Sequence, residues 1–144
     1  MKMRIKIKRI DPAVELPKYH TAESAAFDLA ANEDATVGPG EIKLIKTGLI
    51  VEAPKNHFLL IAMRSGTPRK KGLLIPQGVG IVDRDYSGPE DEIMIQVYNF
   101  TDKPVEVKKG ERLAQGLFLQ ADKVEWKEVS HLREKSRGGF GSTG

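Results

Sequence analysis

The stretch Glu90–Lys103 reads EDEIMIQVYNFTDK and is the longest segment without glycine or proline in the middle of the chain. A long helix would fit there. Ile93, Ile95 and Val97 instead recur at every second position among β-favouring neighbours, which predicts a strand. The apolar run His57–Met63 lies between breakers and predicts a strand buried on both faces. Many short strands with frequent turn signals favour an all-β sandwich, jelly roll or barrel.

Two segments carry helical signals instead. Thr21–Ala31 places alanine and leucine at helical spacing, and alanine is the best helix former. A single helical turn is predicted further along, with Thr67 as its cap, Pro68 at its first position and Gly72 as its stop.

The composition limits the classes of protein to which the chain can belong. The chain has 144 residues, 40% of them hydrophobic and 30% charged, which is typical of one soluble globular domain. It has no cysteine, so disulfides, thiolate metal sites and a cysteine nucleophile are excluded. The N-terminus alternates charge with isoleucine, unlike a signal peptide, and no run of about eighteen apolar residues occurs, so we expect a cytoplasmic protein without a membrane partner. The net charge of +3 fits an anionic partner or a solvated basic face.

Two loops could carry chemistry. Asp83, Asp85 and Tyr86 fall within one predicted turn, where a carboxylate could take a proton from water beside an aromatic wall; an ordinary turn aspartate is the simpler alternative. Arg64–Gly66 follows a predicted strand and could face a phosphate.

Asp28 is the candidate carboxylate for Mg²⁺, which substrate phosphates and water often hold with one or two carboxylates.

The C-terminal segment Gly139–Gly144 spells GxGxxG, but the chain stops where the dinucleotide motif would open a helix, so the match is false. Glycine still lets backbone N–H groups converge on an anion. Hydroxyl groups from Ser142 and Thr143, the charge of Arg137 and the ring of Phe140 would complete a site for a phosphate and an aromatic base. The alternative is a disordered tail.

Taken in order, five short motifs resemble those of the trimeric dUTP pyrophosphatase (dUTPase) family. They span nearly the whole chain and are Ala26–Leu29, Arg64–Gly66, Asp83–Gly88, Gly110–Gln115 and Gly139–Gly144. The resemblance implies an all-β, distorted jelly-roll (β-clip type) subunit with at most one short helix. It implies a homotrimer with sites at subunit interfaces, each built from motifs of all three chains. It also places motif one in a strand or loop, against the helical signal at Thr21–Ala31. We therefore expect a domain over residues 1–132 and a flexible tail over 133–144 that closes over an active site.

The resemblance implies hydrolysis of dUTP to dUMP and pyrophosphate with Mg²⁺, which limits uracil in DNA and supplies dUMP for dTTP synthesis. Asp83 would activate the water that attacks the α-phosphorus in line, and Tyr86 would lie under the deoxyribose. Asp28 would hold the Mg²⁺ shell through water. The implied phosphate contacts are Arg64, Ser65, Gly66 and Gln115.

The same resemblance implies which residues contact the uracil base and which tail residues contact the substrate. Backbone groups of the hairpin Leu74–Val82, including Gly80 and Val82, would read uracil. The tail would supply Phe140 to stack on the base, with Arg137, Gly141, Ser142 and Thr143 at the substrate.

Several positions depart from the usual family pattern. Gln77 stands where many members carry a uracil-contacting asparagine, and Gly88–Glu92 is longer and more acidic than the usual link. Either Arg133 or Arg137 could be the tail arginine. The alternatives are a dCTP deaminase of the same fold and a non-catalytic β-domain that binds nucleic acid; we expect dUTP as the substrate and no nucleic-acid partner.

Overall fold

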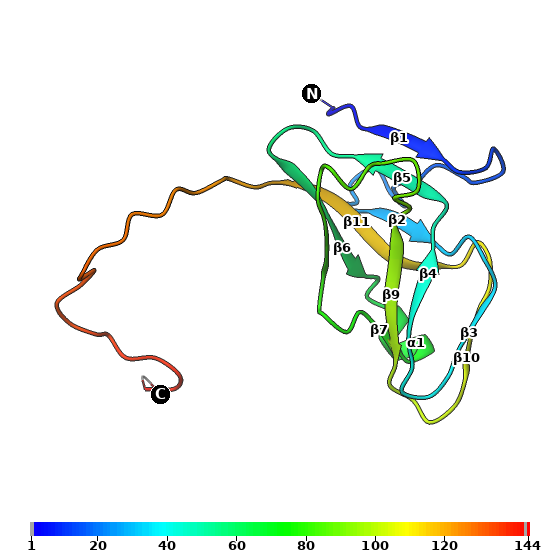
Figure 1. Cartoon of the computed structure of the whole chain (residues 1–144). Helices are drawn as coiled ribbons and strands as arrows, with labels where there is room; N and C mark the ends of the chain where they lie inside the picture. The colour runs from blue at the N-terminus through cyan, green and yellow to red at the C-terminus, as the bar shows by residue number, and fades with distance from the viewer. Residues whose placement is uncertain (1, 143) are drawn as a thin grey trace.

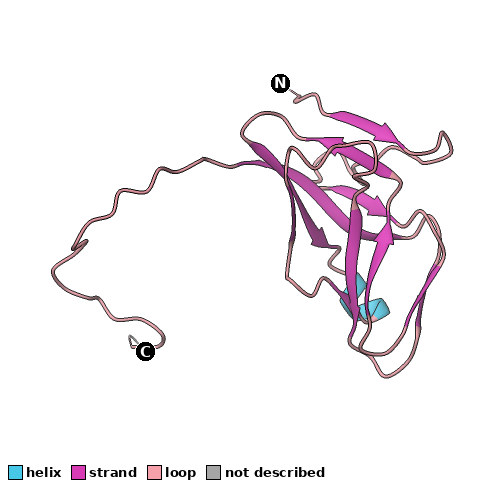
Figure 2. Ribbon diagram, viewed as in Figure 1, coloured by secondary structure: helices cyan, strands magenta, loops and turns pink. Residues whose placement is uncertain are grey.

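The computed structural model describes residues 2–142 and 144 and consists of strands and one short helix (Figure 2). This confirms the expected all-β fold. The elements are β1 Lys6–Arg9, β2 Phe27–Ala30, β3 Ala35–Val37, β4 Ile42–Lys46, β5 Leu49–Glu52, β6 His57–Met63, α1 Thr67–Lys71, β7 Leu73–Leu74, β8 Gly80–Val82, β9 Met94–Asn99, β10 Val105–Val107 and β11 Arg112–Gln120.

The strands form small antiparallel sheets around one core. The largest has the order β2-β11-β6-β8, and a second has the order β4-β9-β7. Two further pairs, β1-β5 and β10-β3, lie beside them (Figure 1). The expected strand in Glu90–Lys103 is confirmed as β9, and its alternating side chains Ile95 and Val97 are fully buried. Ile93, just before the strand, is 2% exposed.

Strand β6 departs from the expected burial. Leu59 and Ile61 are buried in the core, whereas Phe58, Leu60 and Ala62 on the other face are half-buried. The prediction of burial on both faces is therefore wrong, because in the described chain the outer face of this sheet is only partly covered.

The short helix lies where it was expected but is capped differently. Gly66, not Thr67, is the N-cap residue, and it makes no side-chain cap bond. The Thr67 hydroxyl is buried and donates instead to the Leu113 carbonyl at 2.7 Å, which ties the helix to β11. Gly72 ends the helix with a left-handed φ of 73°, and its N–H donates to the Pro68 carbonyl.

The alanine-rich segment Thr21–Ala31 is not a helix. It contains turns and then β2, in which Phe27 and Leu29 are buried at alternate positions. Pairing with β11 supplies the backbone hydrogen bonds, and the two large side chains bury more apolar surface than alanine would. Tertiary context thus overrides helix propensity here.

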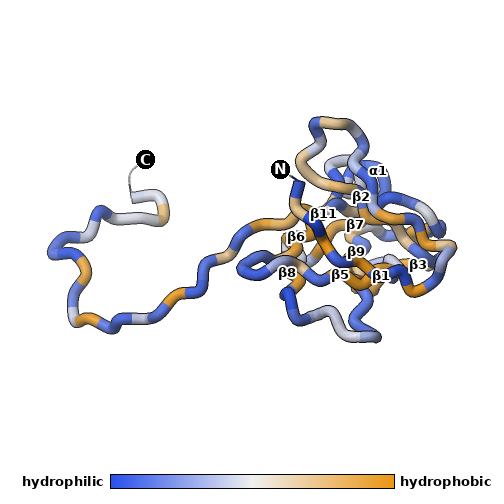
Figure 3. Tube along the Cα trace, turned by 90° about the horizontal axis from the view of Figure 1, so that it is seen from above, coloured by the Kyte–Doolittle hydropathy of each residue, from blue (hydrophilic) through white to orange (hydrophobic). Residues whose placement is uncertain are grey.

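The last strand ends at Gln120, and the chain then leaves the body as an extended arm (Figure 1). The Ala121 N–H still donates to the Asn56 carbonyl at 2.8 Å. Beyond it, Val124, Trp126 and Leu132 are 67%, 90% and 92% exposed, and apolar segments alternate with polar ones along the arm (Figure 3). The division into residues 1–132 and 133–144 stays a prediction. No helix within residues 2–142 and 144 is long and apolar enough to cross a membrane.

Candidate functional site

Three adjacent strands bring the first, second and fourth motifs together. Asp28 on β2 lies opposite Gln115 on β11, and Gln115 in turn lies opposite Ala62 on β6. Arg64 follows the end of β6, beside the start of β11. Antiparallel pairing therefore places these motifs at one end of the largest sheet.

A pair of guanidinium groups converges on Asp28. Nε of Arg64 lies 3.0 Å from Oδ1 of Asp28, and Nη1 of Arg112 donates to Oδ2 at 3.2 Å. The Asp28 side chain is 13% exposed, whereas the two arginine side chains are 33% and 48% exposed. The three side chains together carry one net positive charge, and an anion such as phosphate suits that charge.

Main-chain contacts fix Arg64 further. Its N–H donates to the Leu113 carbonyl at 3.2 Å, and its Nη1 donates to the Arg112 carbonyl at 3.3 Å. Strand β11 has a register irregularity between Arg112 and Ala114, and such bulges re-aim side chains. Gln115 is held by a bond from its Nε2 to the Met63 carbonyl at 3.2 Å.

The remaining residues of the second motif form the turn that leads into α1. Ser65 is exposed, and Gly66 is half-buried. The Arg64 carbonyl accepts from the Thr67 N–H at 3.0 Å, which closes this turn. Ser65 therefore lies at the surface immediately beside the guanidinium pair.

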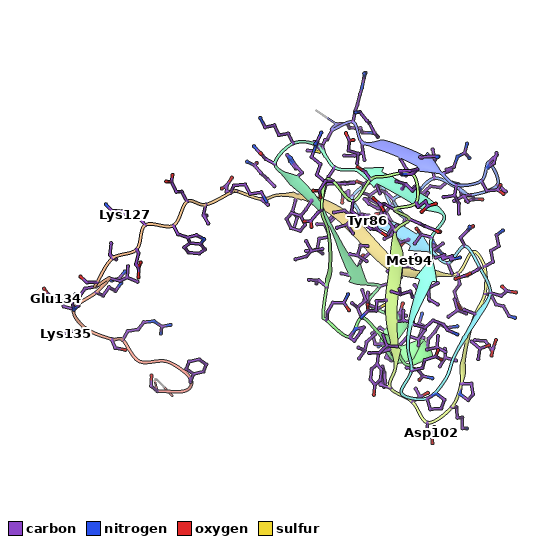
Figure 4. The ribbon with its side chains drawn as sticks, viewed as in Figure 1. Tyr86, Met94, Asp102, Lys127, Glu134 and Lys135 are labelled. Atoms are coloured by element: carbon purple, nitrogen blue, oxygen red, sulfur yellow. The ribbon has the colours of Figure 1, made fainter. Side chains whose placement is uncertain are left out.

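The third motif forms a turn directly after β8. The Tyr86 N–H donates to the Asp83 carbonyl at 3.2 Å, and both side chains are exposed. The Tyr86 hydroxyl donates to the Glu92 carbonyl at 3.0 Å, which fixes the ring on the upper part of the body as drawn in Figure 4.

The acidic segment Gly88–Glu92 is folded back on the body. The Asp91 carboxylate accepts from the Gly88 N–H at 2.8 Å, and the Glu92 carboxylate accepts from the Gly48 N–H at 2.6 Å. Glu92 is only 9% exposed. The residues of this segment therefore hold in place the Glu92 carbonyl, which accepts the hydrogen bond from the Tyr86 hydroxyl.

The hairpin expected to read a base places Gly80 and Val82 on β8. Among the described residues this strand pairs only with β6 and is an edge of its sheet, so backbone groups on its other side are unpaired within that sheet. Gln77 is exposed in the turn before it.

The chain does not bring Asp83 to the guanidinium pair. Val82 lies opposite Leu59, near the start of β6, whereas Arg64 follows the end of β6 at Met63. Four positions of strand separate Leu59 from Met63, which is a distance of about 13 Å along β6. Figures 1 and 4 agree, because Tyr86 lies in the upper half of the body in this view and α1 lies in the lower half. One chain therefore presents two separate groups of candidate site residues.

The tail residues lie on the arm, away from the body (Figure 1). Arg133, Arg137, Phe140, Gly141 and Ser142 are all exposed, and Phe140 has a left-handed φ of 51°. Thr143 lies outside the described residues. The chain brings none of the described tail residues to Asp28 or Asp83.

The described residues contain no group of three or more His, Asp or Glu side chains that could hold a metal ion. A carboxylate offers about four acceptor positions, and two of those on Asp28 face arginines. Asp28 therefore fits a contact to the water shell of a cation better than direct ligation between two guanidinium groups.

Arg112 and Glu92 contact the candidate site residues Asp28 and Tyr86, although neither was singled out from the sequence. Arg112 belongs to the same motif as Gln115 and is the first residue of β11, so its charge at the beginning of a strand was the available signal. Glu92 lies in the segment that departs from the family pattern. The Glu92 carboxylate accepts from the N–H of Gly48, which lies more than forty residues away in the sequence, and no local pattern reveals this contact.

The chain is similar to known proteins over most of its length. The family model described as dUTPase matches residues 13–144. The deoxyuridine 5'-triphosphate nucleotidohydrolase of Lactococcus lactis subsp. lactis (strain IL1403) is 44% identical over 137 residues, which are 91% of this chain and 89% of that protein.

Solved structures resemble this fold closely. The dUTPase from Streptococcus mutans has a TM-score of 0.78 and 33% identity, and the match covers 83% of this chain and 98% of that one. The Staphylococcus bacteriophage 80alpha dUTPase, solved with dUPNHPP, has a TM-score of 0.87 and 24% identity over 99% of both chains, a likeness of fold.

Proposed function

The chain belongs to the dUTPase family, and from this premise we propose that it is a dUTP diphosphatase, which hydrolyses dUTP to dUMP and pyrophosphate. The observation that carries the proposal is the guanidinium pair of Arg64 and Arg112 on Asp28. A triphosphate is the strongly anionic group that such a pair fits.

The phosphate half-site consists of Arg64, Ser65, Gly66 and Gln115. A guanidinium group has five N–H donors, and Arg64 directs only Nε and Nη1 to the contacts described above. Donors therefore remain for phosphate oxygens. The Ser65 hydroxyl and the Gln115 amide lie beside them and would complete the contacts.

The hydrolytic half-site contains Asp83 and Tyr86. Asp83 takes the proton of a water, the water oxygen attacks the α-phosphorus, and the bond from that phosphorus to the α,β-bridging oxygen breaks. Pyrophosphate leaves with that oxygen. Tyr86 lies against the sugar, and the Glu92 carbonyl supports the ring position. An apolar wall alone would reject a ribose hydroxyl by only about 10².

Uracil is read by the hairpin that ends in β8. The unpaired backbone edge of Gly80 and Val82 can offer N–H and C=O groups to the imide edge of the base. Cytosine presents a different donor and acceptor pattern there, and the methyl group of thymine would meet the strand. Gln77 is close enough in sequence to add a side-chain contact.

We propose a homotrimer with sites at subunit interfaces because the two half-sites of one chain lie at opposite ends of a sheet. Arg64 and its neighbours would come from one subunit and Asp83 from another. Apolar surface supports association: Ile42 and Leu44 on β4 are 56% and 52% exposed. The exposed arm with Trp126 also lacks a partner within the described chain.

The tail completes the site from a third chain. Phe140 would stack on uracil, while Arg137 or Arg133 would join Gly141, Ser142 and Thr143 at the phosphates. Closure would exclude bulk water and strengthen each phosphate contact. The full exposure of Phe140 on the arm fits a side chain whose partner is the substrate.

Mg²⁺ fits this arrangement as an ion held mainly by the triphosphate, with Asp28 accepting from its water shell. When bound, the ion neutralises phosphate charge. The physiological proposal is removal of dUTP from the DNA precursor pool and supply of dUMP, in the cytoplasm.

Pyrophosphate release from dUTP, dCTP, dTTP and UTP with Mg²⁺ tests the proposal. We expect turnover of dUTP alone at a high rate. Ammonia from dCTP would instead support a deaminase of this fold, and salt-sensitive oligonucleotide binding without dUTP turnover would support a nucleic-acid-binding domain.

A further inference from the structure

His20 lies next to the guanidinium pair because the chain before β2 turns back on itself. Tyr19 forms an isolated bridge with Phe27, and the Asp28 N–H donates to the Lys18 carbonyl at 3.0 Å. The rings of Tyr19 and Phe27 meet edge to face, with centroids 6.0 Å apart. These contacts anchor the backbone on both sides of the turn and place His20 over the start of β11.

The contact of His20 is with Arg112. Nη1 of Arg112 lies 3.1 Å from Nδ1 of His20 and 3.2 Å from Oδ2 of Asp28. A guanidinium group has no acceptor, so Nδ1 must be the acceptor in this bond. The ring is then neutral and carries its proton on Nε2. A protonated ring would place two positive charges against one another.

We propose that His20 is a positioning residue for the phosphate half-site, an inference that rests on the proposed function. Its unprotonated Nδ1 holds Arg112 toward Asp28, and Asp28 in turn holds Arg64. The side chain does not itself touch substrate. Its effect is to keep two guanidinium groups in the orientation in which they meet phosphate.

The ring faces charged groups from several elements. Arg112 faces His20 from β11, and Arg64 lies beyond Asp28 at the end of β6. The groove beside His20 is also lined by three charged residues from neighbouring loops, namely Glu15, Lys18 and Lys109, and Lys2 lines the adjoining groove. Cations thus outnumber the carboxylates of Glu15 and Asp28 around the ring.

A comparison of His20→Asn with His20→Ala tests the proposal. Asparagine places an acceptor oxygen close to the position of Nδ1 but does not titrate. The full-length variants and wild type are assayed for kcat and KM on dUTP with Mg²⁺ from pH 5.5 to 8.5. His57→Asn is the matched control, because His57 bonds its own loop at the Lys55 carbonyl.

At pH 8 we expect His20→Ala to raise KM by about 2- to 10-fold with a smaller change in kcat, the range that one hydrogen bond supports. His20→Asn should keep KM within about 2-fold of wild type. A protonated imidazole has no acceptor nitrogen, so the KM of wild type should rise on acidification more than that of His20→Asn. Protonation of the substrate itself affects every variant equally.

Equal KM values for wild type and His20→Ala across the pH range would overturn the proposal, as would His20→Asn behaving like His20→Ala. Failure of the wild type to hydrolyse dUTP would instead contradict the proposed function. Inorganic pyrophosphate binding, measured by calorimetry on the same proteins, gives a readout without catalysis, and weaker binding by His20→Ala alone is the expected result.

Discussion

Arg64 and Asp28 form an ion pair in which Nε lies 3.0 Å from Oδ1, although 36 positions of sequence separate the two residues. The pair joins the end of β6 to the middle of β2 across β11. It orients a guanidinium group whose other contact is a backbone carbonyl at 3.3 Å. The carboxylate thus orients two guanidinium groups, and in the proposed phosphate half-site it would do so besides any contact with a hydrated metal ion.

Asp28→Asn should therefore raise KM for dUTP by about 10- to 100-fold, the effect of losing a hydrogen bond to a charged group. The variant adds a net positive charge, which by itself would attract phosphate. We expect the lost orientation of Arg64 and Arg112 to outweigh that attraction. Steady-state kinetics at low and high salt measure the balance, and a lower KM than wild type would contradict the prediction.

Asp83→Asn should lower kcat by about 10³ while KM changes little, because a general base contributes about 10² to 10⁴. Asp102→Asn is the matched control, because this exposed aspartate lies in the loop between β9 and β10, outside all five motifs, and the variant should stay within about 2-fold of wild type. Pyrophosphate release measures both. Near-normal turnover by Asp83→Asn would remove Asp83 from the role of base.

The sequence predicted strands well where burial alternates and poorly where the pattern fits two structures. Ile95 and Val97 gave a clear period of two in β9. The alanines of Thr21–Ala31 fit a helix, but pairing of β2 with β11 decides their structure. In β4, Ile42 and Leu44 are exposed while Ile45 is buried, and alternation cannot tell which face meets the core.

The candidate site was predictable as a set of motifs but not as an arrangement. No local pattern places Arg112 against Asp28, because the contact depends on strand order and on a bulge in β11. The separation of Arg64 from Asp83 likewise follows from the pairing of β6 with β8.

Asn99→Leu should destabilise the fold by about 3 kcal/mol, because it leaves buried partners unsatisfied. Asn99 is fully buried, and its amide donates to the carbonyls of Val37 and Lys103 at 2.9 and 2.7 Å. Its oxygen accepts from the N–H and hydroxyl of Thr101. Urea unfolding at equal protein concentration measures the loss, and a change below about 1 kcal/mol would contradict it.

Gly72→Ala should destabilise the end of α1 for two reasons. Its φ of 73° costs a side chain about 1–2 kcal/mol, and a Cβ there would collide with Cγ2 of Thr101. Gly110→Ala is the control, because its φ is 88° but no atom lies within 4 Å of the added Cβ. Thermal unfolding should rank Gly72→Ala as the less stable variant. Adding Thr101→Ser should recover part of the difference; no recovery would argue against the collision.

Arg64 and Asp83 should act in one site only when they come from different subunits. The reason is their separation within one chain: about 13 Å of β6 already separates Leu59, the partner of Val82, from Met63, and Asp83 and Arg64 each lie one residue further out. Arg64→Ala and Asp83→Asn should each be nearly inactive as pure proteins. Each variant still carries the half-site that the other has lost.

Unfolding the two variants together and refolding them at equal amounts should therefore restore activity. With random assembly, a site has an intact Arg64 in half the cases and an intact Asp83 in half, so about a quarter of wild-type turnover is expected. Mixing the variants without unfolding is the control, because subunits must exchange to combine. If both residues came from the same chain, every site in the mixture would carry one defect, and refolding would restore no activity.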